Sequence, residues 1–214
     1  MRQILALLLI LGASAYGQSG TNSITNPPSS MSTMSKKEIV GTFLGAVLQN
    51  DPATLRELAN KNYIQHNPFI PTGLEPFIQM LPVLQESGTK AENIRMFQDG
   101  NYIFMHNIWR NAEPFGAAEM VSFDIIRLDE NGKVAEHWDA MTILVRETAS
   151  GRSQTDGPTT VEDPEKTEAN KKLAVALVED VLMGKNPENI SRYISEEQYH
   201  QHNPQIKDGL SGIV

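Results

Sequence analysis

Alternating apolar and polar positions mark residues 121–145 as the most regular part of the chain. Two β-branched and aromatic runs flank a cluster of turn formers at residues 129–132, and the last of these is a glycine that can adopt a positive φ. This pattern predicts a β-hairpin. Since alternate residues of a strand share a face, His137, Asp139 and Met141 are expected on one side of the second strand.

Two further β-rich stretches precede the hairpin, at residues 93–98 and 102–110. They are joined through Asp99-Gly100, which is a strong hairpin signal, and a turn at residues 111–116 leads into the next strand. The sequence therefore predicts a meander of four antiparallel strands.

Three helices are predicted ahead of the strands. The first begins at Ser35, where Ser35 and Glu38 form a capping box, and it carries an apolar stripe of Ile39, Val40, Phe43, Leu44, Val47 and Leu48. The second begins at Asp51-Pro52, and the third follows Thr72-Gly73 and is expected to bend or end early at Pro82. Helices followed by strands indicate an α+β domain over residues 35–148, with the helices packed on one face of a curved antiparallel sheet.

The C-terminal part repeats the N-terminal one. A Gly, Ser, Thr and Pro-rich linker at residues 149–162 precedes another helix start, and residues 199–204 (YHQHNP) then match residues 63–68 (YIQHNP) at a constant offset of 136. This match predicts an internal duplication. Residues 163–214 are interpreted as a truncated second copy that contains only the helical half of the domain.

The first 17 residues have the layout of a secretory signal peptide: Arg2, an apolar run, and small residues before the cleavage site. Residues 18–34 read as a flexible leader. We therefore expect an exported protein, with no membrane association after cleavage. Removal of Arg2 takes the net charge from −8 to −9, which argues against nucleic acid as a partner, and the absence of cysteine excludes disulfides and thiolate chemistry.

Asp139 is the first candidate for chemistry. On a covered face its carboxylate can act as a general base with His137 as partner, because burial disfavours the charged form and raises its pKa toward the working range. A solvated hairpin face with an ordinary ion pair is the alternative.

Two more histidines are candidates, each with a structural alternative. His106 shares a strand face with Phe104 and Ile108, and a single imidazole among apolar neighbours is more often a hydrogen-bonded core residue than a catalyst. His66 precedes Asn67-Pro68, where its side chain can instead satisfy the backbone at a helix-to-loop junction.

The order of helices and strands, the YIQHNP segment at residues 63–68 and the segment DENGKVAEHWD at residues 129–139 together resemble a SnoaL-like domain of the nuclear transport factor 2-like superfamily. The resemblance implies a cone-shaped barrel around a pocket, often dimeric through the sheet, with no metal or organic cofactor. In the polyketide cyclases of that family, an aspartate at the strand position matching Asp139 acts as general acid/base. His66, His106 and His137 would be the nearest imidazoles.

Three functions remain open. The first is acid/base chemistry on a small carbonyl compound, such as an aldol condensation, isomerisation or cyclisation, in which a histidine stabilises the enolate; the pocket would be built from Phe43, Phe77, Phe104, Ile108, Phe123 and Met141. The second is a carrier or sensor with the same pocket and no turnover. The third is a metal site formed by His66, His106, His137 and Asp139. A homodimer is a further expectation, through a sheet face bearing Trp109 or Trp138.

Overall fold

The computed structural model describes residues 33–213. The predicted signal peptide at residues 1–17 and all but the last two residues of the predicted leader lie outside this range. Among the described residues, no helix combines the length and the apolar character needed to cross a membrane.

The first helix, α1 (Lys36–Leu48), begins at the predicted capping box. The Ser35 hydroxyl accepts from the backbone N–H of Glu38, and the Glu38 carboxylate accepts from the backbone N–H of Ser35 at 2.7 Å. The second helix, α2 (Pro52–Leu58), is capped by Asp51, whose carboxylate accepts from the next two free N–H groups. Both helix starts were therefore readable from the sequence.

A strand that the sequence analysis missed follows α2 directly. Strand β1 (Ala59–Gln65) pairs in parallel with β5, so the sheet has five strands and is not purely antiparallel. The prediction of a four-stranded antiparallel sheet was wrong at this edge. The strand begins with the polar run Asn60-Lys61-Asn62, which shows no apolar alternation and reads as a loop.

The predicted third helix is two short helices, α3 (Leu74–Ile78) and α4 (Leu81–Glu86). Pro82 occupies the first turn of α4, where its missing N–H costs nothing, and the break falls just before it. Within residues 33–213, four α-helices, rather than three, thus precede the long strands.

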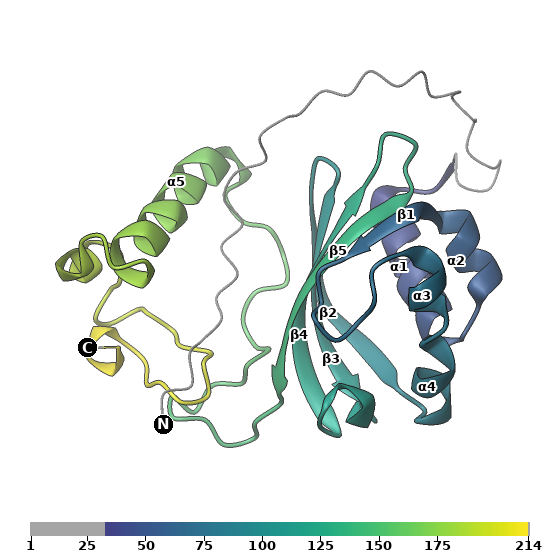
Figure 1. The fold of residues 1–214 in the computed structure, drawn as a ribbon. Helices are drawn as coiled ribbons and strands as arrows, with labels where there is room; N and C mark the ends of the chain where they lie inside the picture. Colours follow the sequence, from purple (N-terminus) through teal and green to yellow (C-terminus); the bar gives the residue numbers. More distant parts are fainter. Residues whose placement is uncertain (1–32, 214) are drawn as a thin grey trace.

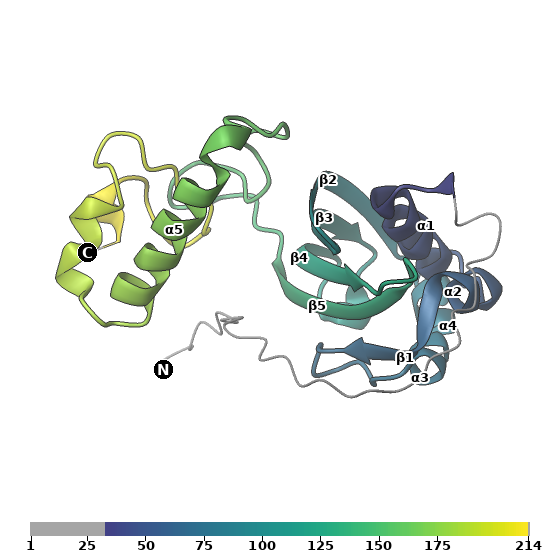
Figure 2. The same ribbon diagram turned by 90° about the horizontal axis from the view of Figure 1, so that it is seen from above.

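The four long strands are β2 (Lys90–Asp99), β3 (Tyr102–Arg110), β4 (Glu119–Leu128) and β5 (Val134–Ile143), and the order across the sheet is β1-β5-β4-β3-β2. A short 3-10 turn, η2 (Glu113–Phe115), connects β3 to β4. The sheet is strongly curved, and α1 to α4 cover its concave face (Figures 1 and 2). The main core lies between these two layers and contains buried residues of each of α1 to α4, including Val40, Leu55, Phe77 and Leu81.

The C-terminal segment lies on the opposite side of the sheet from α1 to α4 (Figures 1 and 2). It contains η3 (Pro164–Lys166), α5 (Thr167–Leu177), the π-helical η4 (Val178–Leu182), η5 (Pro187–Arg192) and η6 (Leu210–Gly212). The linker anchors it to the domain: Gln154 is buried, accepts from the Val145 N–H at 2.6 Å and donates to the Ile143 carbonyl at 3.2 Å.

The two sequence repeats form loops with the same internal hydrogen bonds. Gly73 N–H donates to the Tyr63 carbonyl at 2.9 Å, and Gly209 N–H donates to the Tyr199 carbonyl at 3.0 Å. In each loop, the glutamine side chain also accepts from the asparagine N–H two residues later, at 3.0 and 2.8 Å. These loops match in geometry as well as in sequence; the assignment of the whole C-terminal segment to a second copy of the domain stays a prediction.

Candidate functional site

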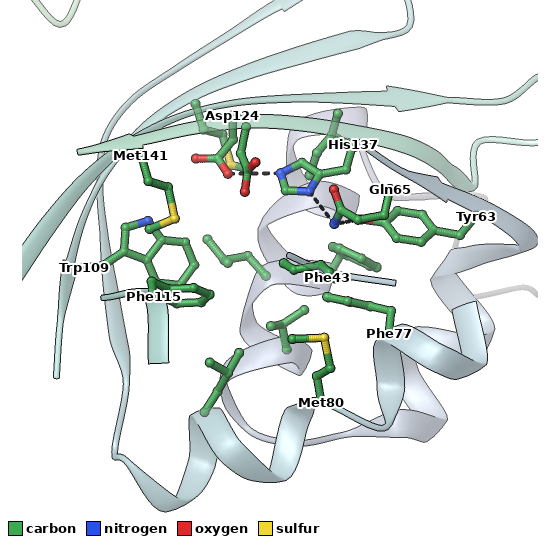
Figure 3. Close-up of a pocket in the computed structure, with 17 residues that line it drawn as sticks. Phe43, Tyr63, Gln65, Phe77, Met80, Trp109, Phe115, Asp124, His137 and Met141 are labelled. Carbon is green, nitrogen blue, oxygen red and sulfur yellow. Dashed lines mark hydrogen bonds and ion pairs between the residues drawn. The ribbon is translucent and has the colours of Figure 1, made fainter. Parts of the chain in front are cut away.

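A buried cavity lies between the concave face of the sheet and the helices, with a volume of about 60 Å³ (Figure 3). Its wall is apolar except at one side, where polar side chains from β1, β4 and β5 converge. The lining residues are Phe43, Leu44, Val47, Tyr63, Gln65, Ile70, Phe77, Met80, Leu84, Met105, Trp109, Phe115, Asp124, Ile126, His137, Asp139 and Met141. A mostly apolar cavity with a few convergent polar groups is the usual form of a small-molecule site.

Asp139 reaches this cavity from β5. Its two carboxyl oxygens lie 2.8 and 3.0 Å from Nδ2 of Asn67, which comes from the loop after β1. Burial of the carboxyl raises the pKa of Asp139 above its ordinary value, although the hydrogen bond from Asn67 acts in the opposite direction. A carboxyl with a raised pKa in a cavity is a candidate general base.

His137 stands beside Asp139 on the same face of β5, as predicted, and both of its ring nitrogens are occupied. Nδ1 lies 3.0 Å from Nε2 of Gln65, and Nε2 lies 3.0 Å from Oδ1 of Asp124. The Gln65 amide is fixed in orientation because its Oε1 accepts from the backbone N–H of Asn67. Nδ1 of His137 therefore accepts a hydrogen bond, and Nε2–H donates to Asp124.

Asp124 is buried beneath this histidine on β4. Its Oδ2 accepts from Nδ2 of Asn107 at 2.8 Å and from the Ser122 hydroxyl, and that hydroxyl accepts from Nε1 of Trp109 at 2.8 Å. Asp124 is not among the site residues that the sequence predicts. The register of the predicted hairpin could have revealed it, because Asp124 lies directly across from Asp139 on the neighbouring strand.

His66 and His106 do not lie in the cavity. His66 is on the opposite face of the sheet, where its Nε2 lies 2.8 Å from Oε1 of Glu136 and its ring stacks on Trp138 at 4.7 Å between centroids. His106 is buried on that same face beside Arg95 and Phe123, and burial together with the charge of Arg95 lowers its pKa to about 4. The placement of His106 agrees with its structural alternative as a core residue. His66 differs from its own alternative, because it follows a strand and its ring contacts the side chains of Glu136 and Trp138 instead of the backbone.

Three of the six predicted pocket residues line the cavity: Phe43, Phe77 and Met141. The other three, Phe104, Ile108 and Phe123, were wrong as lining residues because they share the outward face with His106. Their common face was read correctly from the alternation, but the neighbouring residues Met105 and Trp109 are the ones that point toward the helices. The sequence shows which residues share a face and not which face the helices cover.

The four-residue metal site is not assembled, since His66 and His106 are on the other face of the sheet from His137 and Asp139. In the part of the chain that the structure describes, one group has metal-ligand spacing: Asp124, His137 and Asp139 offer atoms within 4.8 Å of one another. A metal there would have to replace the hydrogen bond between His137 and Asp124. The donor set is one that zinc or iron accepts, but its present geometry is that of a satisfied hydrogen-bond network.

A second, wider hollow adjoins the cavity, with a volume of about 600 Å³. It lies between the loop after β1, helix α4 and the β3–β4 connection. Its wall includes the exposed side chains Phe69 and Val83, and it shares Ile70, Met80, Leu84, Phe115, Asp139 and Met141 with the cavity. Asp139 therefore stands at the junction between a small cavity and a wider hollow.

No protein family matches the chain, and no curated protein does. Solved structures do. A candidate SnoaL-like polyketide cyclase from Shewanella putrefaciens CN-32 is 18% identical with a TM-score of 0.43, and the match covers 57% of this chain and 92% of that one. A candidate polyketide cyclase from Bacillus cereus ATCC 10987 is 14% identical with a TM-score of 0.42, covering 51% and 80%. A nuclear transport factor 2-like protein of unknown function from Cytophaga hutchinsonii ATCC 33406 is 14% identical with a TM-score of 0.42, covering 51% and 92%.

These matches cover about half of this chain. The curved sheet with helices on its concave face is an α+β arrangement, as the sequence predicted; membership of the nuclear transport factor 2-like superfamily stays a prediction. The chemistry of the cavity rests on the side chains described above.

Proposed function

We propose that this protein binds a small, largely apolar carbonyl compound and that Asp139 removes a proton from the carbon next to the carbonyl. The observation that carries this proposal is the place of Asp139, a partly buried carboxyl at the junction of a mostly apolar cavity and a wider hollow. Its raised pKa brings the carboxylate closer to the range in which a general base is efficient at neutral pH.

The proton transfer follows from this geometry. The Asp139 carboxylate takes the proton, the electron pair of the C–H bond forms a C=C bond, and the carbonyl π electrons move to the oxygen as an enolate. The enolate carbon then regains a proton or attacks a second carbonyl, which gives isomerisation or aldol-type ring closure. Asn67 holds the carboxyl in place through both of its oxygens.

The two adjoining spaces support a ligand with a small reacting end. The inner cavity of about 60 Å³ accepts only a few heavy atoms, whereas the hollow of about 600 Å³ accepts the bulk of a larger molecule. Such a ligand would enter through the hollow and place its carbonyl end next to Asp139.

A carrier or sensor is the second candidate, and one observation favours it. Both nitrogens of His137 are hydrogen-bonded to protein groups, so this imidazole is not free to relay the proton from Asp139. Ligand binding without turnover would leave this network undisturbed.

Export and dimerisation are further proposals. The signal-like residues at the N-terminus support export. The outward sheet face supports a homodimer, because it exposes Phe123 and Tyr102 beside the stacked rings of Phe97 and Phe104.

Deuterium exchange tests the enzymatic proposal. Cyclohexanone and a series of 2-alkanones are incubated with the protein in heavy water, and loss of the α-proton signals is followed by NMR. We expect exchange by the wild type and a loss of at least ~100-fold in Asp139→Asn, in line with the usual contribution of a general base. Asp99→Asn, at the exposed end of β2, is the matched control. Binding without exchange would identify a carrier, and equal exchange in wild type and Asp139→Asn would exclude Asp139 as the base.

A further inference from the structure

The hydroxyl of Tyr63 is the starting point. Tyr63 lies on β1 with 1% of its surface exposed, and its ring packs against Phe77 and Phe43 at centroid distances of 5.5 and 6.1 Å. The residue lines the cavity beside Gln65, as Figure 3 shows. A buried phenol normally has a hydrogen-bond partner for its proton.

The hydrogen bonds around Gln65 determine whether the Tyr63 hydroxyl donates or accepts in its contact with this residue. The Gln65 amide has two N–H bonds; Nε2 lies 3.2 Å from the Tyr63 oxygen and 3.0 Å from Nδ1 of His137. Since the amide oxygen of Gln65 accepts from the Asn67 backbone, the amide cannot turn round. The Tyr63 oxygen is therefore an acceptor in this contact, and its own proton is left without an acceptor among residues 33–213.

The other donors at the cavity wall are already engaged. Nε1 of Trp109 donates to Ser122, and Nε2 of His137 donates to Asp124. The Gln65 amide uses both of its N–H bonds, as shown above. Of the described side chains that line the cavity, Tyr63 alone has a donor hydrogen available for a ligand.

Tyr63 also keeps this hydrogen at any ordinary pH. Burial raises the pKa of the phenol well above its usual value, and the negative charges of Asp139 and Asp124 raise it further. The group therefore remains a neutral O–H donor while Asp139 ionises.

We propose that Tyr63 is a catalytic residue that donates its hydroxyl hydrogen to the carbonyl oxygen of the bound compound, and holds that oxygen as negative charge develops on it. This assignment rests on the proposed function and adds the electrophilic half of the site. Asp139 takes the proton from carbon, the electrons move onto oxygen, and Tyr63 stabilises the enolate oxygen without giving up its proton. The proton then returns to carbon from Asp139, so no other reactant is needed. A fixed donor aimed at a developing oxyanion is commonly the largest single contribution to such a rate.

Infrared spectroscopy of the bound carbonyl tests the donor role directly. Cyclohexanone labelled with carbon-13 at the carbonyl is added to the wild type, and its C=O stretch is compared with that in hexane and in Tyr63→Phe. We expect a shift to lower wavenumber in the wild type, and a stretch close to the hexane value in Tyr63→Phe. Tyr102→Phe, on the outward face and 45% exposed, is the matched control. Identical C=O stretches in wild type and Tyr63→Phe would overturn the assignment. A wild-type stretch equal to that in hexane would also overturn it, and that comparison needs no variant.

The exchange rate provides the second readout. In Tyr63→Phe we expect α-proton exchange to fall by ~100-fold, within the range for removal of one oxyanion donor, while the ring and its packing remain. An undiminished rate would overturn the role of Tyr63 and leave the proposed role of Asp139 intact. Absence of exchange in the wild type would instead overturn the proposed enzymatic function, while the carbonyl stretch would still decide whether Tyr63 contacts the ligand.

Discussion

The side-chain amide of Asn67 lies 2.8 and 3.0 Å from the two carboxyl oxygens of Asp139. The two residues come from different parts of the domain, the loop after β1 and the middle of β5. The amide aligns the carboxyl and stabilises its charged form, so it opposes the effect of burial on the pKa.

Asn67→Ala should raise the pKa of Asp139 further, because the carboxylate loses its amide donor while it remains buried. The pH at which ketone exchange becomes efficient should rise with it. A titration of the carboxyl carbon by NMR, in protein labelled at aspartate, measures the pKa directly. Asn62→Ala changes an exposed asparagine on the same strand as Tyr63 and should leave the titration unchanged. An Asp139 pKa that is unaltered or lower in Asn67→Ala would contradict the prediction.

Asp139→Asn should stabilise the protein at neutral pH. The folded state holds the pKa of Asp139 above the ordinary value of 3.8, so it favours the neutral carboxyl and pays for ionisation as pH rises through the folded pKa. The neutral amide avoids this cost. Urea unfolding of both proteins from pH 3 to pH 8 should show an advantage for the variant that vanishes toward pH 3. A variant that is less stable than the wild type throughout this range would refute the argument.

Gln65→Leu should lower the free energy of unfolding by ~1–3 kcal/mol, because buried acceptors on His137 and Tyr63 lose their donor. The same network predicts that the wild-type His137 ring carries its proton on Nε2. Nitrogen-15 NMR of the imidazole distinguishes the two tautomers. A proton on Nδ1 would show that the Gln65 amide is turned the other way.

His106 should make stability fall as the solution is acidified from about pH 6.5 to pH 4. Its pKa is lowered from 6.5 to about 4 in the folded state, so the unfolded chain binds a proton in this window and the folded one does not. One such group contributes a slope of at most ~1.4 kcal/mol per pH unit. His106→Leu should flatten the pH dependence of urea unfolding, whereas His200→Gln, at an exposed position, should not. If the slope of stability against pH persists in His106→Leu, other groups cause it.

The open hollow should set the affinity for longer ligands. Each additional methylene of a 2-alkanone should contribute up to ~0.8 kcal/mol of binding free energy, as long as it contacts the apolar wall of the hollow. Val83→Glu places a charge on this wall and should weaken long 2-alkanones more than short ones, as measured by calorimetry. Leu173→Glu, an exposed apolar residue on α5, is the control. An equal loss of affinity for 2-alkanones of every length would show that Val83 does not contact the alkyl chain of the ligand.

Many element boundaries and one strand face could be predicted from local sequence signals. The capping box at Ser35, the Asp51 cap and the turn formers at residues 129–132 fixed where elements begin and end, and strand alternation placed His137 and Asp139 on one face. These features depend on neighbours in the sequence.

The remaining features depend on long-range packing. Strand β1 is held by pairing with β5, and its polar start carries no apolar pattern. Phe104 and Phe123 were predicted in the pocket because strand alternation does not show which face is covered. The packing of the helices decides that. Asp124 gains its significance from His137 and Asn107 on other strands, and Tyr63 from the helices that pack over its ring; the local sequence specifies neither.

The loop from Tyr63 to Gly73 shares its hydrogen bonds with the loop from Tyr199 to Gly209, where none of the residues belongs to a strand. A conformation that recurs without a sheet beside it is specified by its own residues. The loop that carries Asn67 can therefore adopt its conformation before β5 pairs with β1. That pairing then brings the Asp139 carboxyl to the Asn67 amide. A substitution at residues 66–72, which follow β1, would accordingly alter the alignment of Asp139 with little effect on the sheet.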